Sequence, residues 1–168
     1  MKIIYRAPKK SDLDGLLAFI NELASEGTYV AAEKHTRAEE RKWLDGVLAG
    51  IRKKDEVMVV AEAGGKIIGN CGIKRREKRK MMRHAGIFGI SVLKKYRGKG
   101  IGETLARKVL AQAKGKMGLK LVILSALANN PVAPNLYRKM GFREYGRLPK
   151  AFLFKGKYVG EIDMFREL

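Results

Sequence analysis

Apolar residues recur at intervals of three and four in two segments near the start of the chain, residues 11–23 and 36–51. This spacing puts them on one face of a helix, so the pattern predicts two amphipathic helices. Each segment opens with a serine or threonine followed three residues later by an acidic residue, which is the spacing of a capping box. The pairs are Ser11 with Asp14, and Thr36 with Glu39.

Short runs of valine, isoleucine and other apolar residues occupy much of the remaining chain and predict β-strands. We expect strands at residues 2–7, 57–63, 66–73, 84–92, 119–126, 142–148 and 152–164. Glycines at 64 and 65 predict a hairpin turn between two of them. A glycine-rich turn at residues 97–102 leads into a third helix, and a short fourth helix is expected from Asn135 to Met140, ended by Gly141.

The resulting order, β-α-α-β-β-β-α-β-α-β-β, predicts an α/β fold. Its sheet is expected to be mixed, as in α+β proteins, with helices on both faces. Residues 84–126 comprise a strand, a helix and a strand, and we expect a right-handed crossover between two parallel strands. At 168 residues the chain has the length of one domain, so a single domain over residues 1–168 is expected.

The composition excludes several classes of site. The single cysteine, Cys71, excludes a disulfide framework within the chain and a cysteine-based zinc finger. Two histidines, His35 and His84, are too few for most catalytic zinc sites, so no metal site is expected. Residues 1–6 lack the apolar stretch of a secretory signal, and the longest uncharged run, residues 121–137, contains three asparagines and two prolines. We therefore expect a cytoplasmic protein with no membrane partner.

Basic residues are concentrated in the last two-thirds of the chain. The net charge is +19, yet residues 1–60 carry 11 basic and 10 acidic side chains, whereas residues 61–168 carry 25 and 7. A solvated surface, a phosphate-bearing ligand and nucleic acid are all compatible with this asymmetry. Seven cations lie within residues 74–83, a segment without aromatic residues for base stacking. There we expect a solvated hairpin loop, with an acidic protein partner or a phosphate group of a bound cofactor as the alternatives, and we do not expect a nucleic-acid partner.

The most informative local pattern is V-L-K-K-Y-R-G-K-G-I-G at residues 92–102. Its glycines let the backbone approach a ligand closely, and the first N–H groups of the following helix have no partner within that helix. The helix dipole adds a positive field at the same place. Four cations strengthen it, namely Lys94, Lys95, Arg97 and Lys99. A pyrophosphate is therefore the expected occupant.

Three pyrophosphate motifs compete for this turn. A Walker A loop requires G-x-x-x-x-G-K-[ST], which is absent from the sequence. A dinucleotide-binding turn requires G-x-G-x-x-G and an acidic residue about 20 positions later. Here the glycines are spaced G-x-G-x-G, and residues 104–143 contain no Asp or Glu. The remaining pattern, R-x-x-G-x-G, is met by Arg97, Gly100 and Gly102.

Two motifs together resemble the GNAT superfamily of N-acetyltransferases. The family carries [RQ]-x-x-G-x-[GA] between a strand and a helix, as at residues 97–102, and then N-x-x-A-x-x-L-Y-x-K-x-G-F. The second motif is met by Asn130, Ala133, Leu136, Tyr137, Lys139, Gly141 and Phe142. The element order also matches, so the resemblance covers nearly the whole chain and implies splayed central parallel strands. The sequences of the strand at 84–92 and of the C-terminal tail resemble those of family members that acetylate free amino acids or polyamines.

The resemblance implies direct transfer of acetyl from acetyl-CoA to a primary amine in a ternary complex, with coenzyme A as product. It implies that the turn amides hold the pyrophosphate, and that the Val92 segment binds the pantetheine arm and polarises the thioester carbonyl. Tyr137 would protonate the leaving thiolate, and Asn130 would hydrogen-bond cofactor or substrate. The implied cofactor-binding residues are Val92, Lys94, Arg97, Gly98, Lys99, Gly100, Ile101, Gly102, Asn130, Ala133 and Tyr137.

The acceptor side is less defined by the sequence. Glu26, Tyr29 and His84 are candidate substrate contacts, with Tyr29 expected as an exposed aromatic in a loop at residues 26–34. Candidate general bases are Glu22, Glu26, Glu33 and His84, and loss of the amine proton to water is the alternative. Cys71 is expected to be an inert, small apolar residue.

Several alternatives stay open beside these assignments. Tyr137 could be only a packing aromatic, and Asn130 only a loop cap. The acceptor could be a protein N-terminus or lysine instead of a small amine, and a catalytically silent module that binds coenzyme A or RNA is a further possibility. Edge strands near the C-terminus could pair two subunits in a homodimer.

Overall fold

A seven-stranded sheet forms the centre of the computed structural model, which describes residues 2–29, 32–77 and 79–168. The strand order is β1-β2-β3-β4-β5-β7-β6, with β4 and β5 parallel and the other neighbours antiparallel. The strands are β1 (Ile3–Arg6), β2 (Glu56–Ala63), β3 (Lys66–Arg75), β4 (Ala85–Val92), β5 (Leu121–Leu127), β6 (Arg143–Phe154) and β7 (Lys157–Glu167). The predicted mixed sheet is confirmed, whereas the loop expectations for residues 30, 31 and 78 lie outside the described residues.

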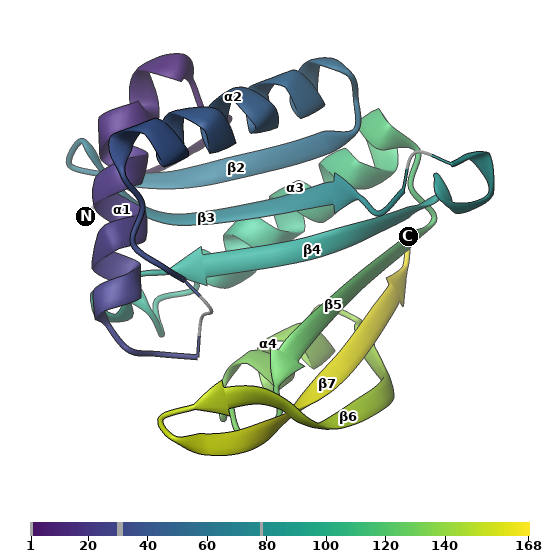
Figure 1. The fold of residues 1–168 in the computed structure, drawn as a ribbon. Helices are drawn as coiled ribbons and strands as arrows, with labels where there is room; N and C mark the ends of the chain where they lie inside the picture. The colour runs from purple at the N-terminus through teal and green to yellow at the C-terminus, as the bar shows by residue number, and fades with distance from the viewer. Residues whose placement is uncertain (1, 30–31, 78) are drawn as a thin grey trace.

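Helices cover both faces of the sheet, as expected (Figure 1). They are α1 (Leu13–Ser25), α2 (Arg37–Arg52), α3 (Ile101–Met117) and α4 (Ala133–Lys139). The pair α1 and α2 contacts β3 and β2 from one face, and α3 contacts β2, β3 and β4 from the other. Tyr137 of α4 joins the apolar core beneath α3, so these two helices share a face.

The parallel strands β4 and β5 separate soon after they meet. They pair only at residues 85–87 with 121–123, and beyond Ile87 they diverge (Figure 1), as the resemblance implied. The opening lies at their carboxyl ends, where β4 leads to the start of α3 and β5 leads to α4. Ligands of open α/β sheets bind at this kind of edge, so the fold places the candidate site here.

The two expected capping boxes have different outcomes. The box of Thr36 and Glu39 is confirmed, since the Glu39 N–H donates to Thr36 Oγ1 at 3.3 Å and the Thr36 N–H donates to Glu39 Oε2 at 2.7 Å. The box predicted from Ser11 is wrong. A 3₁₀ turn precedes α1, and Asp12 accepts from the Lys9 N–H at 2.7 Å because a salt bridge from β1 fixes its carboxylate there.

The C-terminal hairpin also corrects the sequence analysis. A turn near residues 155–157 was expected and is confirmed, but it interrupts the strand expected at residues 152–164, so that strand is wrong: β6 ends at Phe154 and β7 begins at Lys157. Lys155 and Gly156 both have positive φ, 50° and 75°, as the two central residues of a type I′ turn do. The fourth helix begins at Ala133, earlier than expected, because Pro134 is tolerated in a first turn that needs no N–H from it.

The basic segment at residues 74–83 is only partly the solvated loop that we expected. It begins inside β3, where the Arg75 guanidinium is buried and donates to Asp55 Oδ1 at 3.0 Å and to the Met117 carbonyl at 3.0 Å. This cation therefore secures the packing of β3. Exposed basic side chains of the same segment, including Arg79 and Lys80, remain free to face solvent.

At the opposite border of the sheet, β6 is an edge strand with exposed Tyr145, Leu148 and Leu153. Subunit pairing along this strand stays a prediction. Among the described residues, none of the helices combines the length and apolar character needed to cross a lipid bilayer.

Candidate functional site

The open edge of β4 offers backbone hydrogen-bonding groups to a ligand. Leu93 donates its N–H to Ile68 O of β3 at 3.0 Å, which orients alternate residues of β4 toward β3. The N–H and C=O groups of Ile90 and the N–H of Val92 consequently face the other side, where β5 has already diverged, while the Val92 carbonyl is bonded by Arg97. An extended ligand arm can therefore lie along this edge as an additional strand would.

The glycine turn at the end of β4 presents the free amides of a helix start. Gly98 and Gly100 have φ values of 72° and 74°, a conformation that residues other than glycine rarely adopt. A Cβ atom at either position would meet no described atom within 4 Å. The Thr104 N–H donates to Gly100 O at 3.0 Å, so the N–H groups of Ile101 and Gly102 precede the first intrahelical bond. This geometry fits a pyrophosphate, because the donors converge at the positive end of α3.

The cations of the turn do not all face a ligand. The Arg97 Nε donates to Val92 O at 2.7 Å, and its Nη2 donates to Glu26 Oε2 at 2.8 Å. Arg97 therefore braces the turn through these two contacts. Lys99 is exposed, and its ammonium lies 5.6 Å from the centre of the Tyr96 ring. It supplies the turn with positive charge in solvent.

Glu26 lies against the glycine turn as a structural anchor. Its Oε1 accepts from the Lys94 N–H at 2.6 Å, while Oε2 pairs with Arg97. These bonds tie the end of α1 to the turn between β4 and α3. Because both oxygens are engaged, the geometry does not support Glu26 as a base or substrate contact, and the Lys94 amide is likewise engaged.

Tyr137 points its ring into the core beside the opening. It is 8% exposed and packs edge-on against Phe88 and Phe142, with ring centres 5.9 and 6.1 Å apart. Burial, and secondarily the nearby Cys71, raises the pKa of Tyr137 to about 12. No described side chain has a fully buried polar atom without a partner, so the Tyr137 hydroxyl is not sealed in the core. It is a protonated phenol at neutral pH, which suits a proton donor.

Cys71 is fully buried in the core, and burial raises the pKa of its thiol well above the usual range. This environment suits the inert role expected from the sequence.

Asn130 caps the start of α4. Its Oδ1 accepts from the Val132 N–H at 3.0 Å and from the Ala133 N–H at 3.1 Å. The side-chain oxygen of Asn130 therefore acts as the loop cap that was the alternative assignment. The Ala133 N–H is occupied by the same cap. Its carboxamide nitrogen can still donate to a ligand.

Tyr29 is half-buried, so the expectation of a freely exposed aromatic is wrong. Its ring stacks on Phe154 with a centre-to-centre distance of 5.1 Å and an interplanar angle of 19°. This contact joins the loop after α1 to the β6–β7 hairpin. The two segments thereby form a wall on the acceptor side of the opening.

Of the other predicted acceptor residues, His84 lies apart from the opening. His84 is exposed at the start of β4, and the eight residues from it to Val92 span about 26 Å of extended chain. The structure thus does not bring His84 to the turn. Glu22 pairs with Lys66 at 2.6 Å on the surface, and Glu33 is exposed.

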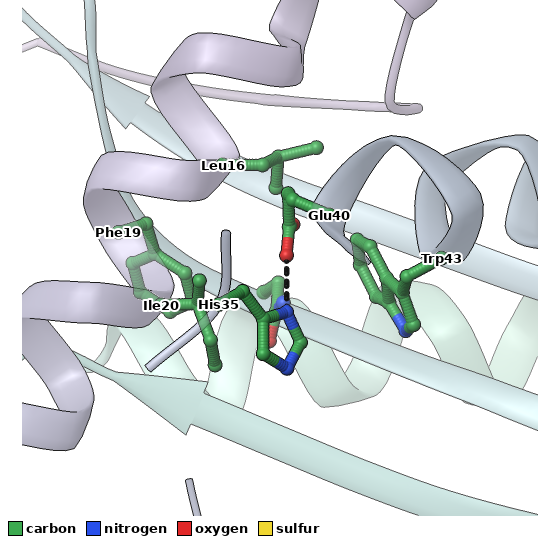
Figure 2. Close-up of a pocket in the computed structure, with 7 residues that line it drawn as sticks. Leu16, Phe19, Ile20, His35, Glu40 and Trp43 are labelled. Atoms are coloured by element: carbon green, nitrogen blue, oxygen red, sulfur yellow. Dashed lines mark hydrogen bonds and ion pairs between the residues drawn. The ribbon is translucent and has the colours of Figure 1, made fainter. Parts of the chain in front are cut away.

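Sequence reasoning missed a hollow of about 110 Å³ between α1, α2 and β3 (Figure 2). His35, Glu40, Trp43 and Asn70 line it together with apolar side chains of α1. The His35 Nδ1 lies 2.7 Å from Glu40 Oε2, and Glu40 is 2% exposed. The available signal was Glu40 itself, an acidic residue at a position where the helical spacing of α2 calls for an apolar one.

Residues 17–142 match the family model described as the Acetyltransferase (GNAT) family. The chain belongs to this family. As a member it is an acyltransferase that takes its acetyl group from acetyl-CoA.

Individual relatives of this GNAT protein differ in how much of it they match. The L-methionine sulfoximine/L-methionine sulfone acetyltransferase of Pseudomonas paraeruginosa is 25% identical over 150 residues, covering 89% of this chain and 85% of the relative. The N-alpha-acetyltransferase RimI of Mycobacterium tuberculosis is 34% identical over 88 residues, or 52% of each chain. The structure of a GNAT-family acetyltransferase from Streptococcus pneumoniae superposes with a TM-score of 0.90 at 24% identity, covering 99% of this chain and 100% of the other.

Proposed function

We propose that this GNAT acetyltransferase acetylates the primary amine of a small molecule, with an amino acid or a polyamine as the favoured acceptor. The observation that carries the proposal is the opening between β4 and β5, which has the glycine turn at its end and Tyr137 beside it. The relative that covers most of this chain is named for amino-acid analogues, which supports a free amino acid. The protein-directed relative covers about half of it.

The donor side of the proposal uses backbone groups. The amides at the start of α3, with Lys99 beside them, hold the pyrophosphate of acetyl-CoA. The exposed edge of β4 at Ile90 and Val92 binds the pantetheine arm by hydrogen bonds, and one of its N–H groups polarises the carbonyl that is attacked. Acetyl-CoA supplies the activated thioester. The Arg97 and Glu26 contacts stiffen the turn, so the cofactor is held in one place while the amine approaches.

Tyr137 supplies the proton that the departing thiolate needs. Its buried environment keeps the phenol protonated at neutral pH, and its hydroxyl is not sealed in the core. A positioned general acid contributes about 10²- to 10⁴-fold to a rate. Asn130 has the smaller part of fixing the start of α4, and with it the position of Tyr137 on that helix.

The test is release of free thiol from acetyl-CoA in the presence of amino acids, methionine sulfoximine, polyamines and peptides with free N-termini. Thiol release with a free amino acid or a polyamine supports the proposal. Release with peptides alone would favour the protein-directed alternative. Binding of coenzyme A without any release would favour a silent module, and retention of RNA that falls steeply with salt would favour nucleic-acid binding.

A further inference from the structure

The hollow on the α1 and α2 face contains a histidine that is held at both its backbone and its ring. The Asn21 side chain accepts from the His35 N–H at 2.8 Å and donates to the His35 carbonyl at 3.1 Å. The ring Nδ1 meets Glu40 Oε2 at 2.7 Å (Figure 2). The His35 side chain is 31% exposed, whereas that of Glu40 is 3% exposed. The imidazole is therefore held by a buried carboxylate while part of its ring is open to solvent.

The carboxylate determines which nitrogen is basic. An ionised Glu40 accepts a hydrogen bond, so it favours the tautomer with the proton on Nδ1 and a free lone pair on Nε2. This arrangement, a base oriented by a third group, is the general signature of an activated proton acceptor.

The position of the hollow relative to the opening follows from the strand register. Asn70 lines the hollow and pairs with Ser91 of β4. Paired residues on neighbouring strands present their side chains on the same face, so the hollow lies beside Ser91. The next residue, Val92, faces the opening with its backbone. The hollow therefore adjoins the carboxyl end of β4, where the reacting carbonyl is held in the proposed function.

The loop that precedes His35 is itself fastened beside the opening. Glu26 fastens the start of this loop to the glycine turn, and Tyr29 fastens it to the β6–β7 hairpin through Phe154. The loop thus contacts both sides of the opening before the chain reaches His35. Tyr137 lies on the other face, because it packs on Phe88, which is three residues from Ser91 and points away from it.

We infer that His35 is the general base for the acceptor amine and that Glu40 is its positioning residue. The inference rests on the proposed function. His35 Nε2 takes a proton from the acceptor ammonium, the freed lone pair forms the C–N bond, and the C–S bond breaks. The proton on His35 passes to water. The second proton lost by the nitrogen balances the one that Tyr137 gives to the thiolate.

The surroundings contain few other ionisable groups that could account for a titration of this site. On α2, Glu39 and Glu40 face His35, and Glu39 is engaged in the capping box. The lining residues from α1 and β3 are apolar side chains and Asn70. An acidic limb of the rate–pH profile that depends on this hollow therefore reports on the His35–Glu40 pair.

The experiment measures kcat/KM against pH for the full chain, at saturating acetyl-CoA, with the best acceptor found by thiol release. We expect His35→Gln to lower kcat/KM about 10²- to 10⁴-fold and to remove the acidic limb. Added imidazole should restore part of the rate in His35→Ala. Glu40→Gln should lower kcat/KM by a smaller factor than His35→Gln does, since the imidazole loses the carboxylate that orients it but keeps its nitrogen. His84→Gln is the matched control and should behave as the parent does.

Each outcome has a defined meaning. Coenzyme A affinity, measured by calorimetry, should be the same in the parent and in His35→Gln, which separates loss of the base from loss of the fold. A His35→Gln variant with the parent's rate and pH profile overturns the inference while leaving the proposed function intact. A variant that loses coenzyme A binding as well assigns His35 a structural role and also overturns it. A parent that acetylates no amine overturns both.

Discussion

Replacing Tyr137 by phenylalanine removes one oxygen atom and leaves the ring packing in place. The contacts with Phe88 and Phe142 are made by ring carbons, and the hydroxyl is not fully buried with an unmet hydrogen bond. We therefore expect the free energy of unfolding to change by less than about 0.5 kcal/mol. Loss of a general acid should lower kcat about 10²- to 10⁴-fold, which raises the barrier by about 3 to 5 kcal/mol.

The pH dependence offers an independent check on Tyr137. A general acid must be protonated, and burial raises the pKa of Tyr137 to about 12. Ionisation of this phenol should therefore leave kcat undiminished up to about pH 11, above the range in which an ordinary tyrosine would fail. Stopped thiol-release assays of the parent and of Tyr137→Phe, with coenzyme A affinity measured separately, test both statements. A variant with the parent's kcat would remove Tyr137 from the mechanism.

Three further predictions concern other parts of the structure. Gly100→Val should weaken coenzyme A binding measured by calorimetry, because its φ of 74° is strained for a β-branched residue; unchanged affinity would argue against the phosphate turn. Glu26→Ala should lower the free energy of unfolding in urea by about 1 to 3 kcal/mol, since Arg97 loses its partner, whereas the exposed Glu22→Ala should cost under about 1 kcal/mol. Equal losses would refute the anchor role. Burial raises the pKa of Glu56 from its usual 4.5 to about 7, so the unfolded chain ionises first and stability falls as pH rises between these values. Glu56→Gln should thus be more stable than the parent at pH 8, by about 3 kcal/mol at most, and equal to it at pH 4; the same difference at both pH values would contradict this account.

The fold was predictable from the sequence where local and long-range preferences agree. Three features form the same local structure that their sequence alone predicts. They are the periodicity of α2, its Thr36–Glu39 box and the glycines at the start of α3. The box at Ser11 failed because Arg6, at the end of the preceding strand β1, binds Asp12 and is itself held by Glu62 of β2. The strand expected at residues 152–164 ran through the expected turn because Lys155 adopts positive φ, which its residue type does not indicate.

The donor side of the site was likewise more predictable than the acceptor side. Its amides belong to one continuous stretch, residues 97–102, so the local sequence of the motif largely determines their geometry. The acceptor side is assembled from α1, α2, β3 and the hairpin, and its contacts depend on tertiary packing. Glu26 turned out to be an anchor for Arg97, and the pairing of His35 with Glu40 becomes visible only when α2 packs on the sheet.

The stacking of Tyr29 on Phe154 has a consequence for how acceptor preference can change. This contact is made by the tip of the last hairpin, far along the chain from the groups proposed to bind the cofactor. Sequence variation at the tip can therefore widen or narrow the amine's entrance while β4 and the first turn of α3 stay as they are. The part of the fold proposed to bind the acetyl donor is thus separate from the part that borders the acceptor amine. The acceptor side can vary in sequence without disturbing the donor side.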